Sequence, residues 1–133
     1  MPGRFAWFGV LPWEDIPVLY RTADVFCLPS IAEPFGGVFV EAMGANTPVV
    51  AHRDMDREWI MGERGGILTD VKSPQKLSRA LTQAYETDWK DGPRSQAMKM
   101  FDWEVIAEKY AEIIDSNLRL YQKHYSRLLP KPE

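Results

Sequence analysis

The stretch of residues 33–50 constrains the fold of this chain more than any other. It reads EPFGGVFVEAMGANTPVV. Pro34 cannot donate a backbone hydrogen bond, and the two glycines that follow let the main chain turn tightly and approach a neighbour without a Cβ atom in the way. The pattern predicts a turn after Pro34, a helix from about Gly36 to Ala45, and then a strand over Val49 to Ala51.

The two glutamates of this stretch fall on different predicted elements. Glu33 precedes the turn, whereas Glu41 lies one turn inside the helix. The free N–H groups and the dipole at a helix N-terminus attract anions, and an ionised carboxylate accepts two vicinal hydroxyl donors at once. We therefore expect a crevice in which Glu33 holds one end of a hydroxyl-rich ligand and Glu41 the other. On the alternative interpretation, Glu33 caps a helix, Glu41 is a solvated helix residue and the glycines only make a turn.

Short β-like runs alternate with helical patterns along the chain, which predicts a parallel sheet with helices on its faces. Strands are predicted at Phe5 to Phe8, Val25 to Leu28, Val49 to Ala51 and Gly66 to Thr69. Helices are predicted from Pro17 through Thr22, after a cap at Ser73, after Gly92-Pro93 and after a cap at Asp102.

Several side chains are assigned to the core or to solvent. In the helix at 36–45, Val38, Ala42 and Ala45 are expected to face the core. The helix after Ser73 has an apolar face of Leu77, Ala80, Leu81, Ala84 and Tyr85. The alternating acidic run at residues 54–58 is interpreted as a solvated loop with no metal site.

Composition limits the class of function. The chain has 133 residues and a formal net charge of -3, which suits one domain and argues against an electrostatic nucleic-acid binder. The single cysteine, Cys27, lies in an apolar run, so core packing is its expected role. No apolar stretch approaches the length of a membrane span, and the N-terminus lacks the hydrophobic block of a signal peptide. We expect a soluble, cytoplasmic protein.

The stretch from Arg21 to Ala51 closely resembles the C-terminal nucleotide-sugar domain of retaining glycosyltransferases with the GT-B fold, family 4 type. The likeness rests on the strand that ends at Pro29-Ser30, on the paired glutamates and on the strand start at residues 47–50. It extends more weakly to Phe5 to Gly9, Gly65 to Leu68 and Phe101 to Glu104. The resemblance implies a partial GT-B half: an α/β, Rossmann-like parallel sheet over residues 1–116, followed by a helical tail over 117–133.

The resemblance also implies roles for the residues of the crevice. By it, Glu33 contacts the hydroxyls of the donor sugar and is the candidate catalytic residue, and Glu41 contacts the ribose hydroxyls. Main-chain N–H groups near Phe35, Gly36 and Gly37 would face the sugar or the diphosphate. Such enzymes need no metal and no cofactor, because Lys, Arg and helix N-termini stabilise the departing diphosphate.

The chain departs from the family pattern in its motif. Gly37 stands where a larger apolar residue is common, and Asn46 stands where glycine is usual; asparagine still tolerates the left-handed position that ends a helix. His52 follows a predicted strand and is placed toward the crevice. No spacing singles out a phosphate-binding arginine, so a solvated surface position is expected for each of Arg4, Arg21, Arg53, Arg57 and Arg64.

By the resemblance, two strands and the acceptor domain are missing. The strand at Phe5 to Phe8 would then pair with that at Val25 to Leu28, or a partner chain or a second copy of this one would fill the gap. The basic, apolar segment Asn117 to Lys131 suits packing onto the missing N-terminal domain or contact with a membrane surface. A frayed terminus is the third interpretation.

Three functions remain open. The first is the donor-binding part of a retaining glycosyltransferase that uses a nucleotide-sugar and is inactive alone. The second is a non-catalytic, truncated or split module that binds a nucleotide-sugar or a partner. The third is an unrelated α/β domain whose glutamates are structural.

Overall fold

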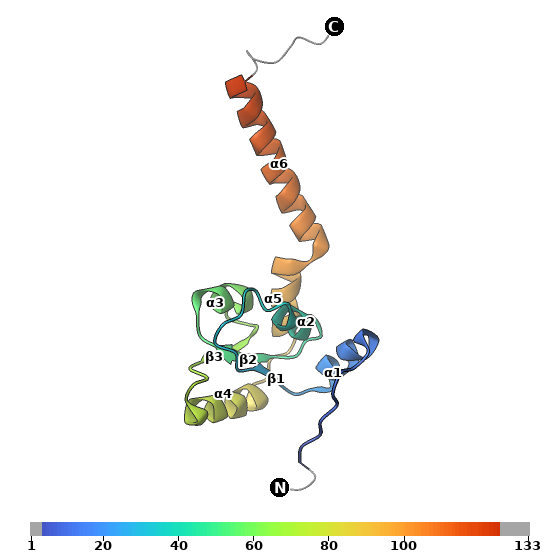
Figure 1. Cartoon of the computed structure of the whole chain (residues 1–133), viewed down its shortest axis with the longest axis vertical. Helices are drawn as coiled ribbons and strands as arrows, with labels where there is room; N and C mark the ends of the chain where they lie inside the picture. Colours follow the sequence, from blue (N-terminus) through green and yellow to red (C-terminus); the bar gives the residue numbers. More distant parts are fainter. Residues whose placement is uncertain (1–3, 126–133) are drawn as a thin grey trace. The chain divides into compact units, whose positions relative to one another are not determined.

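The computed structural model describes residues 4–125 (Figure 1). Its elements are η1 (Trp13–Asp15), α1 (Ile16–Thr22), β1 (Phe26–Leu28), α2 (Gly37–Gly44), β2 (Val49–His52), α3 (Met55–Met61), β3 (Gly66–Thr69), α4 (Pro74–Glu86), α5 (Gly92–Phe101) and α6 (Trp103–Tyr125). The chain divides into two compact units, Met1–Met98 and Lys99–Glu133.

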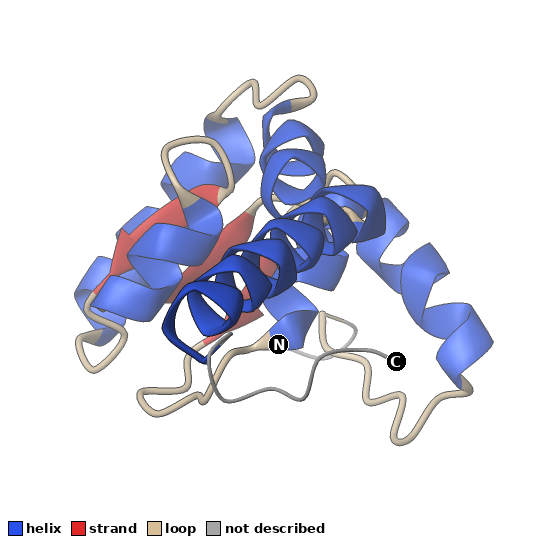
Figure 2. Ribbon diagram, turned by 90° about the horizontal axis from the view of Figure 1, so that it is seen from above, coloured by secondary structure: helices blue, strands red, loops and turns tan. Residues whose placement is uncertain are grey.

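A three-stranded sheet in the order β1-β2-β3 forms the centre of the first unit. All its pairings are parallel, with Phe26 opposite Val49 and Val49 opposite Gly66. Each strand is joined to the next through a helix, as parallel strands require, and Figure 2 shows helices around the strands. The predicted α/β fold with a parallel, Rossmann-like sheet is confirmed, and three of the predicted strands form within a residue of their expected bounds.

Alternate residues of the strands face two different sets of helices. Val50 packs with Ala80 and Ala84 of α4, and Cys27 and Ile67, its partners on the neighbouring strands, join the same cluster. The expected core role of Cys27 is therefore confirmed, and burial raises the pKa of its thiol. The other face of the sheet is covered by α2 and α3, which both contact β2 and lie across the sheet from α4 in Figure 1.

The buried face of α2 differs from the predicted one. Phe39, Ala42 and Met43 are fully buried, whereas Val38 and Ala45 are half-buried. Residues spaced by four lie one above the other on a helix, so the two largest side chains turn together onto the sheet. The predicted apolar face of α4 is right at Ala80 and Ala84 but wrong at Tyr85, which is exposed.

The strand predicted at Phe5 to Phe8 is wrong. These residues form no strand, and their large side chains are exposed, Trp7 to 84%. An apolar run becomes a strand only where its backbone groups find a partner, and among the described residues β1 pairs with β2 alone. β1 therefore lies at the edge of the sheet.

Residues 54–58, predicted as a solvated loop, belong largely to α3. Asp54 caps this helix, and its Oδ1 accepts a hydrogen bond of 2.9 Å from the Arg57 backbone N–H. The Arg57 side chain is also not on the surface as predicted, because the residue is only 2% exposed. Its guanidinium pairs with the Asp54 carboxylate, donates to the Ser30 carbonyl at 3.1 Å and lies 5.6 Å from the centre of the Phe39 ring.

The second unit contains the long helix α6. Asp102 caps it as predicted, because its Oδ1 accepts a hydrogen bond of 2.9 Å from the Glu104 N–H. None of the described residues of α6 is buried. The helix continues through position 116, where the predicted domain boundary lies; that division stays a prediction. Residues 126–131 of the predicted basic segment lie outside the described residues, and no described helix is both long and apolar enough to cross a membrane.

Candidate functional site

The loop that follows β1 carries the first predicted glutamate. Glu33 is half-buried, and its Oε2 accepts a hydrogen bond of 3.4 Å from the Ser30 hydroxyl. Arg57 holds the Ser30 carbonyl in turn. The loop is thus fixed from α3, an element that comes later in the chain and lies on the same side of the sheet as α2.

The turn into α2 requires glycine at position 36. Gly36 has a φ of 76° and a ψ of 56°, in the left-handed region. A Cβ atom there would meet the Phe39 ring at 2.4 Å and the Glu33 Cγ at 3.1 Å. The residue caps α2 without a side-chain hydrogen bond, so no side chain competes for the N–H groups of the first turn. Gly37 is different, because a Cβ atom there would meet nothing within 4 Å.

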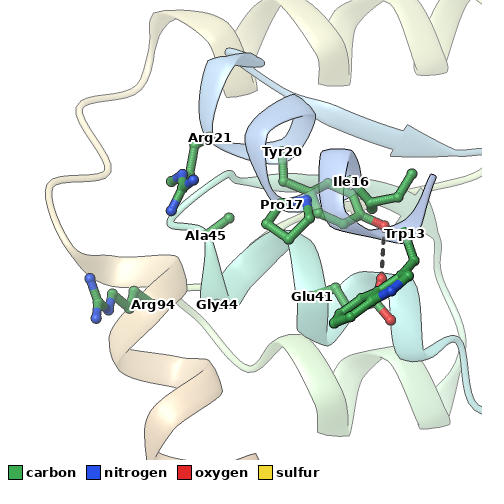
Figure 3. Close-up of a pocket in the computed structure, with 9 residues that line it drawn as sticks. All are labelled: Trp13, Ile16, Pro17, Tyr20, Arg21, Glu41, Gly44, Ala45 and Arg94. Carbon is green, nitrogen blue, oxygen red and sulfur yellow. Dashed lines mark hydrogen bonds between the residues drawn. The ribbon is translucent and has the colours of Figure 1, made fainter. Parts of the chain in front are cut away.

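Glu41 lies at a separate hollow of about 540 Å³. The hollow is lined by Trp13, Ile16, Pro17, Tyr20, Arg21, Glu41, Gly44, Ala45 and Arg94. Figure 3 shows Glu41 beside Trp13 at one end and the two arginines at the other. One wall is therefore apolar and aromatic, while carboxylate and guanidinium groups supply acceptors and donors.

A hydrogen bond joins α1 to Glu41 in this hollow. The Tyr20 hydroxyl donates to the Glu41 Oε2 at 3.1 Å, drawn as the dashed line in Figure 3. Burial, and then the charge of Glu41 and the hydrogen bond to it, raise the pKa of Tyr20 to about 12. The phenol is protonated at neutral pH and donates a hydrogen bond to Glu41.

The left-handed residue that ends α2 brings α5 to the hollow. Asn46 has a φ of 67°, which confirms the predicted helix end. Its side-chain amide donates to the Lys90 carbonyl at 2.7 Å and accepts from the Arg94 N–H at 3.3 Å. Arg94 thereby reaches a hollow formed mostly by residues of α1 and α2.

The structure brings some of the predicted site residues together and keeps others apart. Glu33, Phe35 and Gly36 lie in the segment between β1 and α2, and Gly37 is the first residue of α2. Phe35 is exposed. Glu41 lines the hollow with α1 and α5, and Glu33 is not part of that lining. Their joint contact with one ligand stays a prediction.

Two further predictions concern a ligand contact of His52 and the absence of a metal site. His52 was expected to follow the strand but is the last residue of β2. Its Nδ1 atom is buried with no hydrogen-bond partner in the described part of the chain. Contact between His52 and a ligand stays a prediction. Over residues 4–125, no group of three or more His, Cys, Asp or Glu side chains could hold a metal ion. Function without a metal or cofactor also stays a prediction.

Of the residues that line the hollow, sequence reasoning assigned only Glu41 to the site, and it missed Trp13, Tyr20 and Arg94 among others. Tyr20 lay in a predicted helix and carried no motif of its own. Arg94 is placed by a hydrogen bond to a residue 48 positions away, and no local pattern announces such a contact. Arg21 was expected on the surface; it is exposed but also lines the hollow.

Comparison with known proteins decides the family. The family model described as "Glycosyl transferases group 1" matches residues 2–101. The chain belongs to this family. The matched part of the chain contains every element of the site, from η1 to α5, and ends before α6. The resemblance drawn from the motif is therefore confirmed.

Individual relatives cover most of the chain. O-antigen chain mannosyltransferase B of Escherichia coli is 30% identical over 106 residues, which are 77% of this chain and 28% of that protein. D-inositol 3-phosphate glycosyltransferase of Corynebacterium urealyticum is 33% identical over 110 residues, 79% of this chain and 26% of the relative. Mannosylfructose-phosphate synthase of Agrobacterium fabrum is 29% identical over 119 residues, which are 84% of this chain and 26% of that protein. The chain thus spans between 26% and 28% of the length of these relatives.

Proposed function

We propose that this chain is the donor-binding part of a retaining glycosyltransferase, which transfers a sugar from a nucleotide-sugar to an acceptor. The observation that carries the proposal is the placement of Glu41 in a hollow of about 540 Å³. Glu41 lies in α2, the helix that begins directly after Gly36 and the loop that carries Glu33. The size of the hollow lies in the range of small-molecule sites. Membership of the group 1 glycosyltransferases supports the class of reaction.

Each glutamate has a proposed contact. Glu41 accepts the two ribose hydroxyls, because a carboxylate has about four acceptor positions and the bond from Tyr20 uses one. Glu33 accepts hydroxyls of the donor sugar and is the candidate catalytic residue. The main chain at Phe35, Gly36 and Gly37 faces the sugar or the diphosphate, in keeping with a helix N-terminus that has no side-chain cap.

Charge in the hollow suits an anionic nucleotide. Arg21 and Arg94 line the same hollow as Glu41, so they would favour a ligand that carries both hydroxyls and negative charge. The proposed enzyme works in the cytoplasm without a metal ion. Acceptor binding and the remaining phosphate contacts belong to a further domain or a partner chain.

The second candidate is a nucleotide-sugar-binding module that performs no transfer. The observation that favours it is that Glu33, the candidate catalytic residue, does not line the hollow that contains Glu41. Addition of an upstream domain or chain that restores sugar transfer would favour the enzyme. Donor binding without transfer under every such condition would favour the module.

Calorimetric titration with UDP-, GDP- and ADP-sugars tests donor binding. We expect the chain to bind one nucleotide class and Glu41→Ala to bind it at least about tenfold more weakly, because a charged hydrogen bond is worth roughly 1.5–3 kcal/mol. Glu86→Ala is the matched control, since Glu86 is exposed at the end of α4 and does not line the hollow. Circular dichroism first establishes that all variants are folded.

The outcome separates binding from mere folding. If Glu41→Ala and the unsubstituted chain bind the nucleotide-sugar with equal affinity, Glu41 is not part of the donor site. A folded chain that binds none of the three classes would overturn the proposal.

A further inference from the structure

We propose that Tyr20 is a positioning residue, which holds the Glu41 carboxylate in the orientation that receives the ribose hydroxyls. The inference rests on the proposed function and adds the residue that arranges its donor site. Tyr20 acts through Glu41 and not through the reacting atoms.

The contact between the two side chains carries the inference. Tyr20 belongs to α1 and Glu41 to α2, and both line the same hollow. The Tyr20 hydroxyl donates to the Glu41 Oε2 at 3.1 Å. An exposed glutamate on a helix otherwise samples several rotamers, and a ligand that needs one of them must supply the ordering free energy. A donor already in place reduces that cost.

Tyr20 can hold Glu41 because it is itself held at two further points. Its ring packs edge-on against Phe26 of β1, with the ring centres 5.3 Å apart and the planes at 80°. Its backbone carbonyl accepts a hydrogen bond from the hydroxyl of Thr47, which is 2% exposed. These contacts join Tyr20 to the sheet and to the segment that leads into β2. Glu41 is thus oriented from the rigid centre of the unit.

The charge state of the pair suits positioning. A tyrosine is protonated at neutral pH, and burial together with the charge of Glu41 raises the pKa of Tyr20 further, to about 12. The protonated phenol donates a hydrogen bond to Glu41. It does not become a phenolate that would accept the ligand hydroxyls in place of Glu41. A carboxylate has about four acceptor positions, so the bond from Tyr20 leaves room for a vicinal diol.

Tyr20→Phe tests the inference, because it keeps the ring on Phe26 and removes only the hydroxyl. The whole chain is titrated by calorimetry with UDP, GDP and ADP, and then with the 2′,3′-dideoxy form of the nucleotide that binds most tightly. We expect the ribonucleotide to bind about five- to tenfold more weakly to Tyr20→Phe and the dideoxynucleotide to bind equally to both proteins. Tyr85→Phe, at an exposed tyrosine of α4, should leave both affinities unchanged.

A double-mutant cycle with Glu41→Gln measures whether the effect of Tyr20→Phe on affinity depends on Glu41. If Tyr20 acts through Glu41, Tyr20→Phe should cause little further loss of ribonucleotide affinity in the Glu41→Gln protein. Losses that simply add would overturn the positioning role. Equal weakening of ribo- and dideoxynucleotide would also overturn it, since that result indicates a structural contact. An unchanged chain that binds none of the nucleotides would instead overturn the proposed function, and this inference with it.

Discussion

Gly36 shows how one residue shapes this site. Its left-handed backbone turns the chain from the loop after β1 into α2. The same residue lies so close to Phe39 and Glu33 that a Cβ atom would overlap the Phe39 ring. Backbone conformation and local packing therefore both require glycine at this position. They determine where α2 starts and where Glu33 lies.

Replacement of Gly36 by alanine should destabilise the chain. We expect Gly36→Ala to lower the free energy of unfolding by about 2 kcal/mol, because alanine pays for the left-handed conformation and displaces the Phe39 ring. Gly37→Ala is the matched control, with no atom near its Cβ and an expected change within about 0.5 kcal/mol. Urea unfolding followed by circular dichroism measures both. Equal stability of the two variants would contradict the role given to Gly36.

At the scale of elements, α3 supports the loop that carries Glu33. Its N-cap Asp54 binds the backbone of Arg57 and also pairs with the Arg57 side chain. Arg57 then donates to the carbonyl and the hydroxyl of Ser30, and Ser30 donates to Glu33. A chain of hydrogen bonds thus leads from the start of α3 to the predicted catalytic carboxylate.

Loss of the Asp54 side chain should weaken this support. We expect Asp54→Ala to lower the free energy of unfolding by at least about 2 kcal/mol. The substitution removes a helix cap and leaves the buried Arg57 guanidinium without its carboxylate. Asp56→Ala, at an exposed acid in the first turn of the same helix, should cost about 0.5 kcal/mol. Urea unfolding compares the two variants. Similar losses would indicate that the helix dipole, and not the cap and ion pair, dominates at this end of α3.

The molecule as a whole consists of two units with different kinds of burial. In the first unit, Val49, Val50 and Ala51 of β2 are completely buried, and β2 pairs with a strand on each side. In the second unit, none of the described residues of α6 is buried. Local stability follows burial and hydrogen bonding, so α6 should open locally much more readily than β2.

Hydrogen exchange measured by mass spectrometry should distinguish the two units. We expect the amides of β2 to exchange at a rate set by unfolding of the first unit, and those of α6 to exchange much faster, because an unburied helix opens locally. Phe39→Ala should accelerate exchange in β2, since loss of a buried phenylalanine costs about 3–5 kcal/mol. Leu118→Ala, at an exposed position of α6, is the control and should not affect β2. Slow exchange in α6 would show that it is covered in solution, for example by a second copy of the chain.

The sequence by itself determined the features that local backbone chemistry controls. Pro34 and the glycines after it fixed the turn before α2, and Asn46 fixed the left-handed end of that helix. Alternation of strand-like and helical runs determined the parallel α/β arrangement. These features depend on neighbours in the chain, which a sequence displays directly.

Only the tertiary structure decided the features that depend on distant partners. It buried Arg57 beside Phe39, joined Tyr20 to Glu41 and brought Arg94 to the same hollow. It also left the strand-like residues 5–8 without a strand. The physical reason is the same in each case: an ionic, hydrogen-bonding or strand-forming group takes its final state from the partner it meets in space, and the spacing of residues along the chain does not reveal that partner.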